Sequence, residues 1–114
     1  MIEKTTFGSM TIKGRVYITD LMIFPDGRIV DQWWRAKGHR LALADIMVLV
    51  EQSPDLIIAG MGIYGRMKAE KRLHEALAGK GIELITAWTK AAADHFNMVV
   101  RQQSNVAACF HLTC

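Results

Sequence analysis

The feature that most constrains the fold is a short apolar run, Asp55-Leu56-Ile57-Ile58-Ala59, that passes directly into the glycine-rich stretch Gly60-Met61-Gly62-Ile63-Tyr64-Gly65. A continuous apolar run of this length is typical of an interior parallel strand, which is covered on both faces. Parallel strands are joined by crossover connections, which are usually helices. We therefore expect this strand to lie inside an α/β sheet, with helices before and after it in the sequence.

Helix and strand patterns do alternate along the later part of the chain. Apolar residues at helical spacing predict helices, and short apolar runs between them predict strands. Ser53-Pro54 is expected to end the first helix, because the residue before a proline avoids the α conformation. Thr89 is the expected N-cap of the last helix. The expected helices cover residues 43–52, 66–77 and 91–101, and the expected strands cover 55–59, 82–87 and 106–112.

The first third of the chain has the pattern of strands joined by tight turns. Gly14 separates two extended segments, and Pro25-Asp26-Gly27-Arg28 follows an apolar run in the order typical of a hairpin turn. The return strand is expected over residues 29–34, so that Trp33 and Trp34 point to opposite faces of it. These hairpins would add antiparallel strands or a small second sheet. Aspartates beside such turns are ordinary there, and three fit this description: Asp20, Asp26 and Asp31.

Length and composition set the domain count and exclude several classes of protein. With 114 residues, 51% of them hydrophobic, and no linker, the chain is expected to form a single domain over 1–114. The net charge of +3 is mild, and the basic residues of 66–72 alternate with acidic ones, which is typical of a solvated helix face rather than a nucleic-acid-binding surface. The longest apolar stretch, 41–50, is too short to span a membrane. Two cysteines form no disulfide framework and no leader pattern opens the sequence, so a cytoplasmic location is expected.

The glycine stretch is the motif with the most direct chemical meaning. It matches G-x-G-x-x-G between an expected strand and an expected helix, which is the context of a dinucleotide-binding turn. A strand-rich region precedes it, the next strand ends on Thr86 rather than on an acid, and the chain is short for a second nucleotide-binding half. No cofactor is therefore expected. The glycines form either a tight strand-to-helix turn or a cradle for a small ligand or anion.

The carboxyl ends of the parallel strands define the edge where a ligand is expected. If the strands before the glycine stretch and before Trp88 are parallel, the two loops are neighbours, and open α/β sheets bind ligands at that edge. Trp88 with Met61 would form an apolar lip beside polar amides, and Arg66 would add positive charge. His39 is a further candidate for lining a pocket. The candidate ligand-binding residues are Gly60, Met61, Gly62, Gly65, Arg66, Trp88 and His39.

Cys109, His111 and Cys114 lie close together near the end of the sequence. Strand alternation places Cys109 and His111 on one face, and His39 or His95 would be needed to complete a zinc site. The C-x-H-x-x-C spacing matches no common zinc motif, and a buried cysteine usually packs as a small hydrophobe, so no metal site is expected. A His111–Cys114 catalytic pair would need a thiolate beside an orienting imidazole, and no catalytic residue is predicted. The roles of Cys109, His111 and Cys114 stay open.

Several short motifs occur in an order that is distinctive when they are taken together. They are Gly8 with Thr11-Ile12, Asp20 before a strand, Trp34-Arg35 with Gly38-His39, residues 54–62, Gly81-Ile82-Glu83, Thr89 with Ala92 or Ala93, Phe96-Asn97, and residues 106–114 with their His-Leu-Thr-Cys ending. This set resembles the Mth938-domain family, which includes adipogenesis-associated Mth938-domain proteins and mitochondrial complex I assembly factor three. The resemblance covers nearly the whole chain and implies a three-layer α/β sandwich with a central mixed sheet. It implies no enzyme activity and no catalytic residues, and the assembly role belongs to mitochondrial relatives that carry targeting extensions.

The sequence therefore predicts a binding protein more readily than an enzyme. The leading hypothesis is a non-enzymatic binding or assembly-type domain whose partner is a protein or a small molecule. The alternative is a sensor of a small ligand or anion, or a small enzyme, that uses the edge formed by residues 60–65. Neither nucleic-acid binding nor membrane insertion is expected, and an exposed Trp33 or Trp34 would favour a homo-oligomer.

Overall fold

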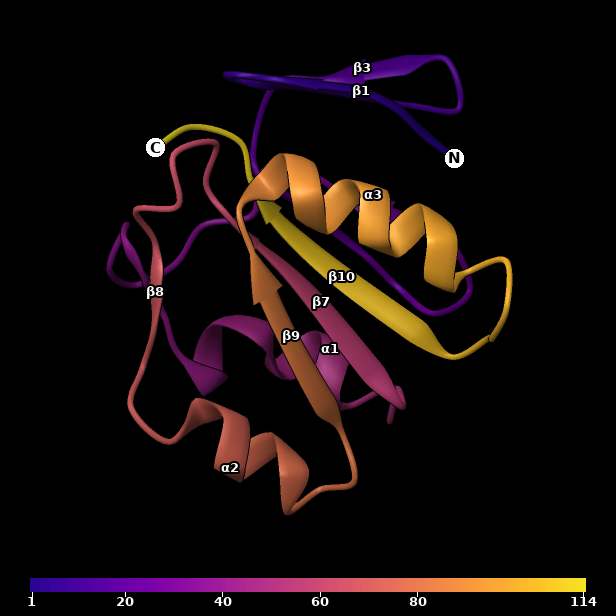
Figure 1. Ribbon diagram of the computed structural model, residues 1–114. Coiled ribbons are helices and arrows are strands. Elements are labelled where there is room, and N and C mark those ends of the chain that lie inside the picture. Colours follow the sequence, from indigo (N-terminus) through magenta and orange to yellow (C-terminus); the bar gives the residue numbers. More distant parts are fainter.

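A mixed five-stranded sheet forms the middle of the computed structural model, which describes residues 1–114 (Figure 1). The strands are β1 (Ile2–Thr6), β2 (Ser9–Ile12), β3 (Arg15–Tyr17), β4 (Leu21–Ile23), β5 (Ile29–Val30), β6 (Arg40–Leu41), β7 (Leu56–Met61), β8 (Lys68–Ala69), β9 (Glu83–Ala87) and β10 (Val106–His111). The helices are the 3-10 helix η1 (Leu43–Ile46), α1 (Met47–Val50), α2 (Leu73–Ala78) and α3 (Thr89–Val99). The central order is β5-β4-β10-β7-β9, in which β10, β7 and β9 are parallel and the other two pairings are antiparallel.

Two smaller sheets complete the architecture. The first three strands form an antiparallel sheet in the order β1-β2-β3, and β6 pairs with β8 in parallel. The sheet of β1 to β3 is tied to α3 by Asn97, whose side-chain amide exchanges two hydrogen bonds with the main chain of Ile2, at 3.0 and 2.8 Å. The expected N-terminal hairpins are therefore present, and they cover one end of the central sheet.

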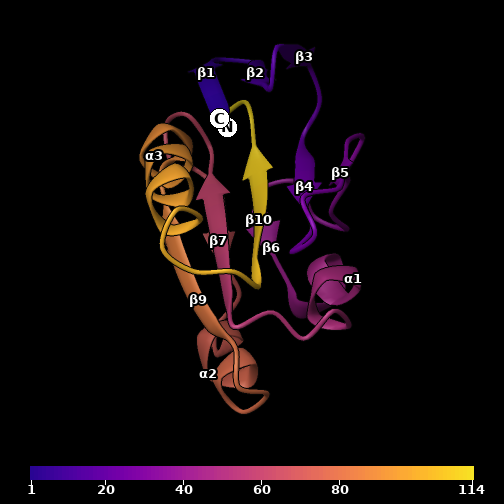
Figure 2. The same ribbon diagram turned by 90° about the vertical axis from the view of Figure 1, so that its right-hand side faces the viewer.

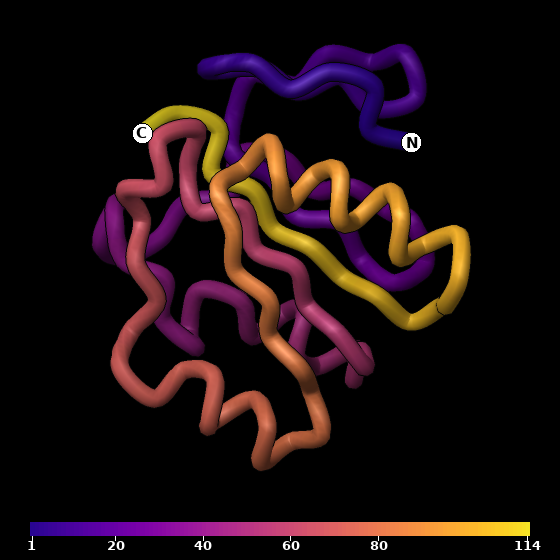
Figure 3. Tube along the Cα trace, in the orientation of Figure 1, coloured from indigo at the N-terminus to yellow at the C-terminus, as the bar shows by residue number.

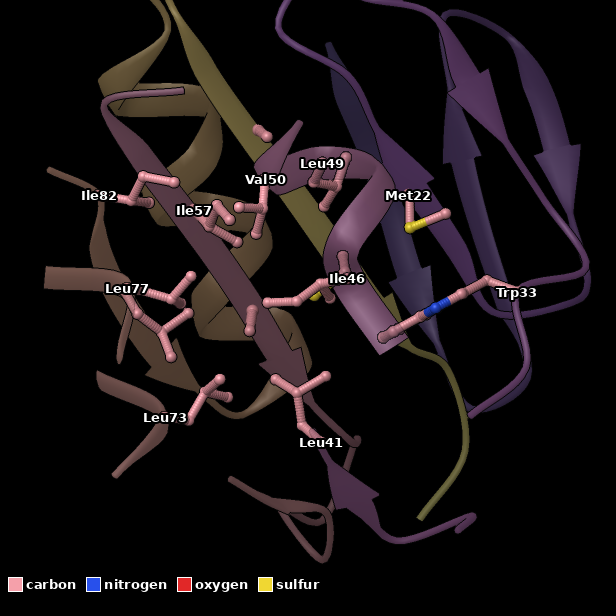
Figure 4. Packing of buried hydrophobic residues seen from close by; sticks show 14 of the residues in the cluster. Met22, Trp33, Leu41, Ile46, Leu49, Val50, Ile57, Leu73, Leu77 and Ile82 are labelled. Carbon is pink, nitrogen blue, oxygen red and sulfur yellow. The ribbon is translucent and has the colours of Figure 1, made fainter. Parts of the chain in front are cut away.

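Helices cover both faces of the central sheet. After a turn of 90°, α3 lies on one side of β7 and β10 and α1 lies on the other (Figure 2). One buried cluster joins α1 and α2 to the sheet (Figure 4), and a second joins α3 and the β1-β2-β3 sheet to the opposite face. The first cluster includes Ile46, Leu49, Leu73, Leu77, Ile57 and Cys109, and the second includes Ile2, Met10, Phe96, Ile58 and Phe110. The predicted three-layer α/β sandwich with a mixed central sheet is confirmed.

Strand β7 shows why its apolar sequence requires an interior position. All of its residues are buried, and successive side chains enter different clusters: Ile57 and Ala59 enter the first, and Leu56 and Ile58 enter the second. This division follows from the alternation of side chains along a strand. The connection from β7 through α2 to β9 and the connection from β9 through α3 to β10 cross the sheet in opposite directions. Because connections between parallel strands are right-handed, α2 and α3 lie on opposite faces of the sheet.

The predicted helix over 66–77 is wrong in its first half. The segment after the glycine stretch is extended as β8, and the main-chain N–H of Lys68 donates to the carbonyl of His39 at 2.9 Å. Helix α2 begins only after Arg72, which has a φ of 68°. The glycine stretch therefore leads into another strand and does not open a helix.

The predicted return strand over 29–34 is also wrong beyond its first residues. Only β5 pairs with β4, and Gln32, with a φ of 54°, leaves the extended conformation. The indole nitrogen of Trp33 donates to the carbonyl of Asp45 at 2.9 Å, so Trp33 is buried while Trp34 is exposed. The two tryptophans do differ in burial, but a loop rather than strand alternation separates them.

The other two predicted helices are present with altered starts. The helix expected over 43–52 begins as η1 and continues as α1, and the last helix begins at Thr89 with Trp88 in the N-cap position. Thr89 is therefore not the N-cap. None of the helices combines the length and the apolar character that crossing a membrane requires.

Candidate functional site

The parallel strands β7, β9 and β10 end at one edge of the sheet, as expected for the ligand edge of an α/β fold. The loop of residues 62–67 follows β7, Trp88 follows β9, and the tail of residues 112–114 follows β10. This tail and this loop lie side by side in the tube view (Figure 3). We call these three segments the carboxyl edge.

A buried threonine ties the three strand ends together. The hydroxyl of Thr89 donates to the carbonyl of His111 at 2.6 Å and accepts from the main-chain N–H of Gly62 at 2.9 Å. The main-chain N–H of Thr89 donates in turn to the carbonyl of Gly62 at 2.9 Å. Because the hydroxyl both donates and accepts a hydrogen bond, Thr89 positions the end of β10 and the loop after β7 against the start of α3.

Each glycine of the motif has a packing reason. A Cβ on Gly60 would lie 2.7 Å from a phenyl carbon of β10, one on Gly62 would collide with the main-chain carbonyl of Cys114, and one on Gly65 would collide with the indole of Trp88. Gly62 and Gly65 also have φ values of 109° and 66°, which L side chains rarely adopt. These contacts support the interpretation of the motif as a tight turn.

The amides of this loop are occupied by carbonyls of the same chain. The N–H of Ile63 donates to the carbonyl of Thr113 at 2.7 Å, and the N–H of Arg66 donates to the carbonyl of Cys114 at 2.8 Å. Further N–H groups that donate within the chain are those of Gly62, Gly65 and Met67. Since most of the loop amides already have partners, a ligand at this edge would contact mainly side chains.

A hollow of about 200 Å³ lies beside the loop and brings several of the candidate residues together. Its lining includes Met61, Gly65, Lys68, Thr86 and Trp88. The ammonium of Lys68 donates to the carbonyl of Gly65 at 3.2 Å. Met61 is buried, so it does not form the exposed lip that the sequence suggests, whereas Trp88 is exposed.

Three aromatic side chains are exposed at the carboxyl edge. Phe7, from the turn between β1 and β2, is 53% exposed, Tyr64 is 55% exposed, and Trp88 is 59% exposed. The rings of Phe7 and Tyr64 are 5.8 Å apart at their centroids, and the indole of Trp88 packs on Gly65, the residue after Tyr64. We call these three residues the aromatic cluster. Phe7 was not identified from the sequence, because nothing local links it to the later loops.

A buried ion-pair network lies beneath the same edge. One carboxylate oxygen of Asp20 is 2.7 Å from Nδ1 of His111 and 2.8 Å from Nη2 of Arg35, and the other accepts from the N–H of Leu112 at 2.7 Å. Since Arg35 is a permanent donor and Asp20 is the acceptor, Nδ1 of His111 carries the proton that is directed at Asp20. Nη1 of Arg35 and Nε2 of His111 are buried without a hydrogen-bond partner.

The charge on Asp20 is stabilised by this network. Burial alone would raise the pKa of Asp20, but the hydrogen bonds from His111 and Leu112 and the charges of His111 and Arg35 outweigh it and hold the pKa below its usual value. The interpretation of Asp20 as an ordinary turn residue is therefore wrong. The sequence signal that pointed to it was its place, with Trp34-Arg35, among the ordered family motifs.

The remaining candidates lie close to this network. His39 is exposed, and its ring lies 5.8 Å from the ring of His111 in an edge-to-face arrangement. Burial raises the pKa of Cys109 to about 12, so this residue supplies no thiolate at neutral pH. The carbonyl of Cys114 is held by the loop after β7, which fixes the C-terminal residue in place. Arg35 occupies the side of Asp20 that a metal shared with His111 would need, and no group of three ligating side chains is present.

Comparison with known proteins supports the architecture over the whole chain. Residues 2–111 match the family described as "Protein of unknown function (DUF498/DUF598)". The conserved hypothetical protein PH1505 from Pyrococcus horikoshii OT3 is similar with a TM-score of 0.87 and 24% identity, over 100% of this chain and 99% of that one. MT938 gives a TM-score of 0.84 and 26% identity over 100% and 98% of the two chains. A Bordetella pertussis protein described as a Mth938-like domain gives a TM-score of 0.64 and 14% identity over 98% and 85% of the two chains.

Proposed function

Because the chain belongs to the DUF498/DUF598 family, a family of unknown function that includes the Mth938-like fold, we propose a function from its geometry: a non-enzymatic binding domain of the assembly type. The partner is a protein that docks on the carboxyl edge. The observation that carries this proposal is the aromatic cluster: the exposed rings of Phe7 and Tyr64 lie 5.8 Å apart, and the exposed indole of Trp88 packs on Gly65, the residue after Tyr64.

The aromatic cluster has the chemistry of an interface core. Aromatic side chains are enriched at protein interfaces, where a few of them supply most of the binding free energy. Burial of one such anchor by a partner contributes about 2 kcal/mol or more. Tyrosine and tryptophan side chains have only two rotatable bonds each, so Tyr64 and Trp88 would supply large contact areas at a low cost in conformational entropy.

The charges around the cluster select the kind of partner. Arg66 lies in the loop after β7, Lys68 follows that loop, and Lys90 lies two residues after Trp88; all three are exposed. Such a border favours a partner segment with an apolar anchor and acidic flanks, because complementary charges at the rim speed association and exclude wrong partners. The buried Asp20 network supports this edge from below and stays out of direct contact with a partner.

The test compares proteins retained from the native host by the wild type and by matched variants. In the edge variant, Tyr64→Ala and Trp88→Ala are combined. Met98→Ala, on the far part of α3, removes a side chain that is 54% exposed and serves as the control. We expect one protein to be retained by the wild type and by the control and lost from the edge variant, and its acidic segment to bind as a peptide in calorimetry. Equal retention by all three proteins would contradict the proposal.

The hollow beside Trp88 favours a second candidate function, the sensing of a small ligand. Its lining combines the indole, a threonine hydroxyl and the ammonium of Lys68, which suits a small acid with an apolar part. Thermal stabilisation by a library of such acids, lost in Lys68→Met, would favour this function over protein docking. A dimer in sedimentation that dissociates in the edge variant would instead make the partner a second copy of the chain.

We also propose the cytoplasm as the place of action. Both cysteines are free thiols, and one is buried in the core, which is typical of proteins from reducing compartments.

A further inference from the structure

Strand β9 is an end strand of the central sheet, and no further strand pairs with its outer side (Figure 1). The N–H of Glu83 donates to the carbonyl of Asp55 at 3.0 Å, and the parallel pairing with β7 then continues in register to the end of β9. In a parallel pair alternate residues bond to the neighbouring strand, so Glu83 and every second residue after it face β7. The main-chain N–H and C=O groups of Leu84 and Thr86 therefore point outward, where the sheet ends.

Strand β9 lacks the features that protect sheet edges from further pairing. Exposed edges are usually blunted by very short strands, prolines, lysines or bulges. The other end strand, β5, has two residues, whereas β9 has five, pairs without a bulge and contains neither proline nor lysine. The single charge of β9 is Glu83, at its start. The outer edge of β9 is therefore open to a sixth strand, about 4.8 Å away.

The hollow beside Trp88 lies at the carboxyl end of this edge. Its lining joins Thr86 and Trp88 to Gly65 and Lys68, and it contains no acidic side chain. The ammonium of Lys68 has three donors, of which one is directed at the carbonyl of Gly65 at 3.2 Å, and it takes part in no ion pair. An acidic side chain with an apolar stem, such as glutamate, would fit beside the indole and the ammonium.

We propose that the partner segment binds as an extended acidic strand added to the outer edge of β9. This inference rests on the proposed function, because it names how the partner of the carboxyl edge is held. The main chain of the segment pairs with Leu84 and Thr86, and one of its acidic side chains enters the hollow and lies beside Lys68. In strand addition the main-chain hydrogen bonds give affinity, and pockets for alternate side chains give specificity.

The experiment titrates the full chain with the peptide acetyl-Val-Glu-Val-Glu-Val-Glu-amide and follows main-chain amides by NMR. Two control peptides carry N-methyl groups, one on every valine and the other on every glutamate. Successive N–H groups of a strand point to opposite edges, so only one of the two methylated sets faces β9.

We expect saturable shifts at residues 84–88 and slower hydrogen exchange of the Thr86 amide when the unmodified peptide binds. One methylated peptide should bind at least tenfold more weakly, and the other should bind about as well as the unmodified one. Equal affinities of the two methylated peptides, whether kept or lost, would overturn the proposal. No saturable binding of the unmodified peptide would overturn it as well.

A pair of variants tests the same edge from the side of the protein. Thr86→Pro removes an outward N–H, and proline is tolerated on an edge strand where its nitrogen faces solvent. Thr86→Val keeps that N–H and nearly the same shape. We expect the peptide to bind at least tenfold more weakly to Thr86→Pro and with unchanged affinity to Thr86→Val. Equal affinities of the two variants would overturn the proposal, and if Thr86→Pro does not fold, the methylated peptides decide with the wild type.

The protein retained from the native host separates this inference from the proposed function. Loss of that protein from Thr86→Pro but not from Thr86→Val would support strand addition. Its retention by Thr86→Pro, together with its loss from the edge variant, would overturn strand addition and leave the proposed function intact. A wild-type dimer in sedimentation that dissociates in Thr86→Pro would make the added strand that of a second copy, and would overturn the proposal.

Discussion

Replacement of Asp20 by asparagine tests whether the buried network stabilises the protein. The carboxylate accepts from Nδ1 of His111, from Nη2 of Arg35 and from the N–H of Leu112, all at 2.7–2.8 Å. In Asp20→Asn the charge is lost, so the buried guanidinium of Arg35 loses its counter-ion, and in either orientation the new NH2 group faces at least one donor that the carboxylate accepted from. Breaking a buried pair in this way costs about 3 kcal/mol at neutral pH.

The loss of stability in Asp20→Asn should become smaller at low pH. The pKa of Asp20 is lower in the folded protein than in the unfolded chain, so the folded state favours the ionised carboxyl. Its contribution to the free energy of unfolding is complete above the unfolded pKa of about 3.9 and is lost as the pH falls through the lower folded pKa. The difference in stability between wild type and Asp20→Asn should therefore be largest near neutral pH and should narrow below about pH 4.

Urea unfolding, followed by tryptophan fluorescence and circular dichroism between pH 7 and pH 3, measures both effects. With a slope of about 1–3 kcal/mol per molar urea, the expected loss moves the midpoint at pH 7 by about 1–3 M. Glu3→Gln is the control, because hydrogen bonds from the main chain of Gly14 and Lys13 also lower the pKa of Glu3, yet this carboxylate is exposed. Glu3→Gln should lower the free energy of unfolding much less than Asp20→Asn does. A loss below about 1 kcal/mol in Asp20→Asn, or a gap that stays constant with pH, would refute the reasoning.

Three further outcomes follow from the carboxyl edge. Thr89→Val should lower the free energy of unfolding by about 2 kcal/mol, because it leaves an N–H and a carbonyl buried without partners, and Thr89→Ser should restore most of the loss in the same urea assay. Gly62→Ala should lower the free energy of unfolding clearly more than Gly14→Ala does. Both glycines have positive φ, but only at Gly62 does the new Cβ meet another main-chain segment. Equal losses of stability in the two variants would argue against this packing. Because burial raises the pKa of Cys109 to about 12, a thiol reagent at pH 8 should label Cys114 alone in the folded protein, and labelling should cease in Cys114→Ser.

The fold could be predicted where its cause is local. The apolar run of β7 specifies an interior strand by itself, because any alternative would leave side chains of one face in water. The Pro25 to Arg28 turn likewise specifies its hairpin through its own residues. The segment around Lys68 is different, because its apolar spacing fits a helix and yet it pairs with β6, far back in the sequence. Such long-range pairing overrides local preference, and a single sequence does not reveal it.

The difference between local and long-range causes also explains which parts of the candidate site could be predicted from the sequence. The position of the glycine motif at the carboxyl edge follows from strand order, and the structure places the motif beside Trp88, as expected. The reason for its glycines is not local: Gly62 makes room for the C-terminal tail and Gly65 makes room for the indole, so the letters of a dinucleotide motif arise here from packing between loops. Two of the three partners of Asp20, His111 and Leu112, lie 91 and 92 positions away on β10 and its tail, and no periodicity connects positions so distant. The residues that shape this edge could not be predicted from local sequence patterns, because each contacts residues from another part of the chain. The substitutions at Asp20, Thr89 and Gly62 test those long-range contacts.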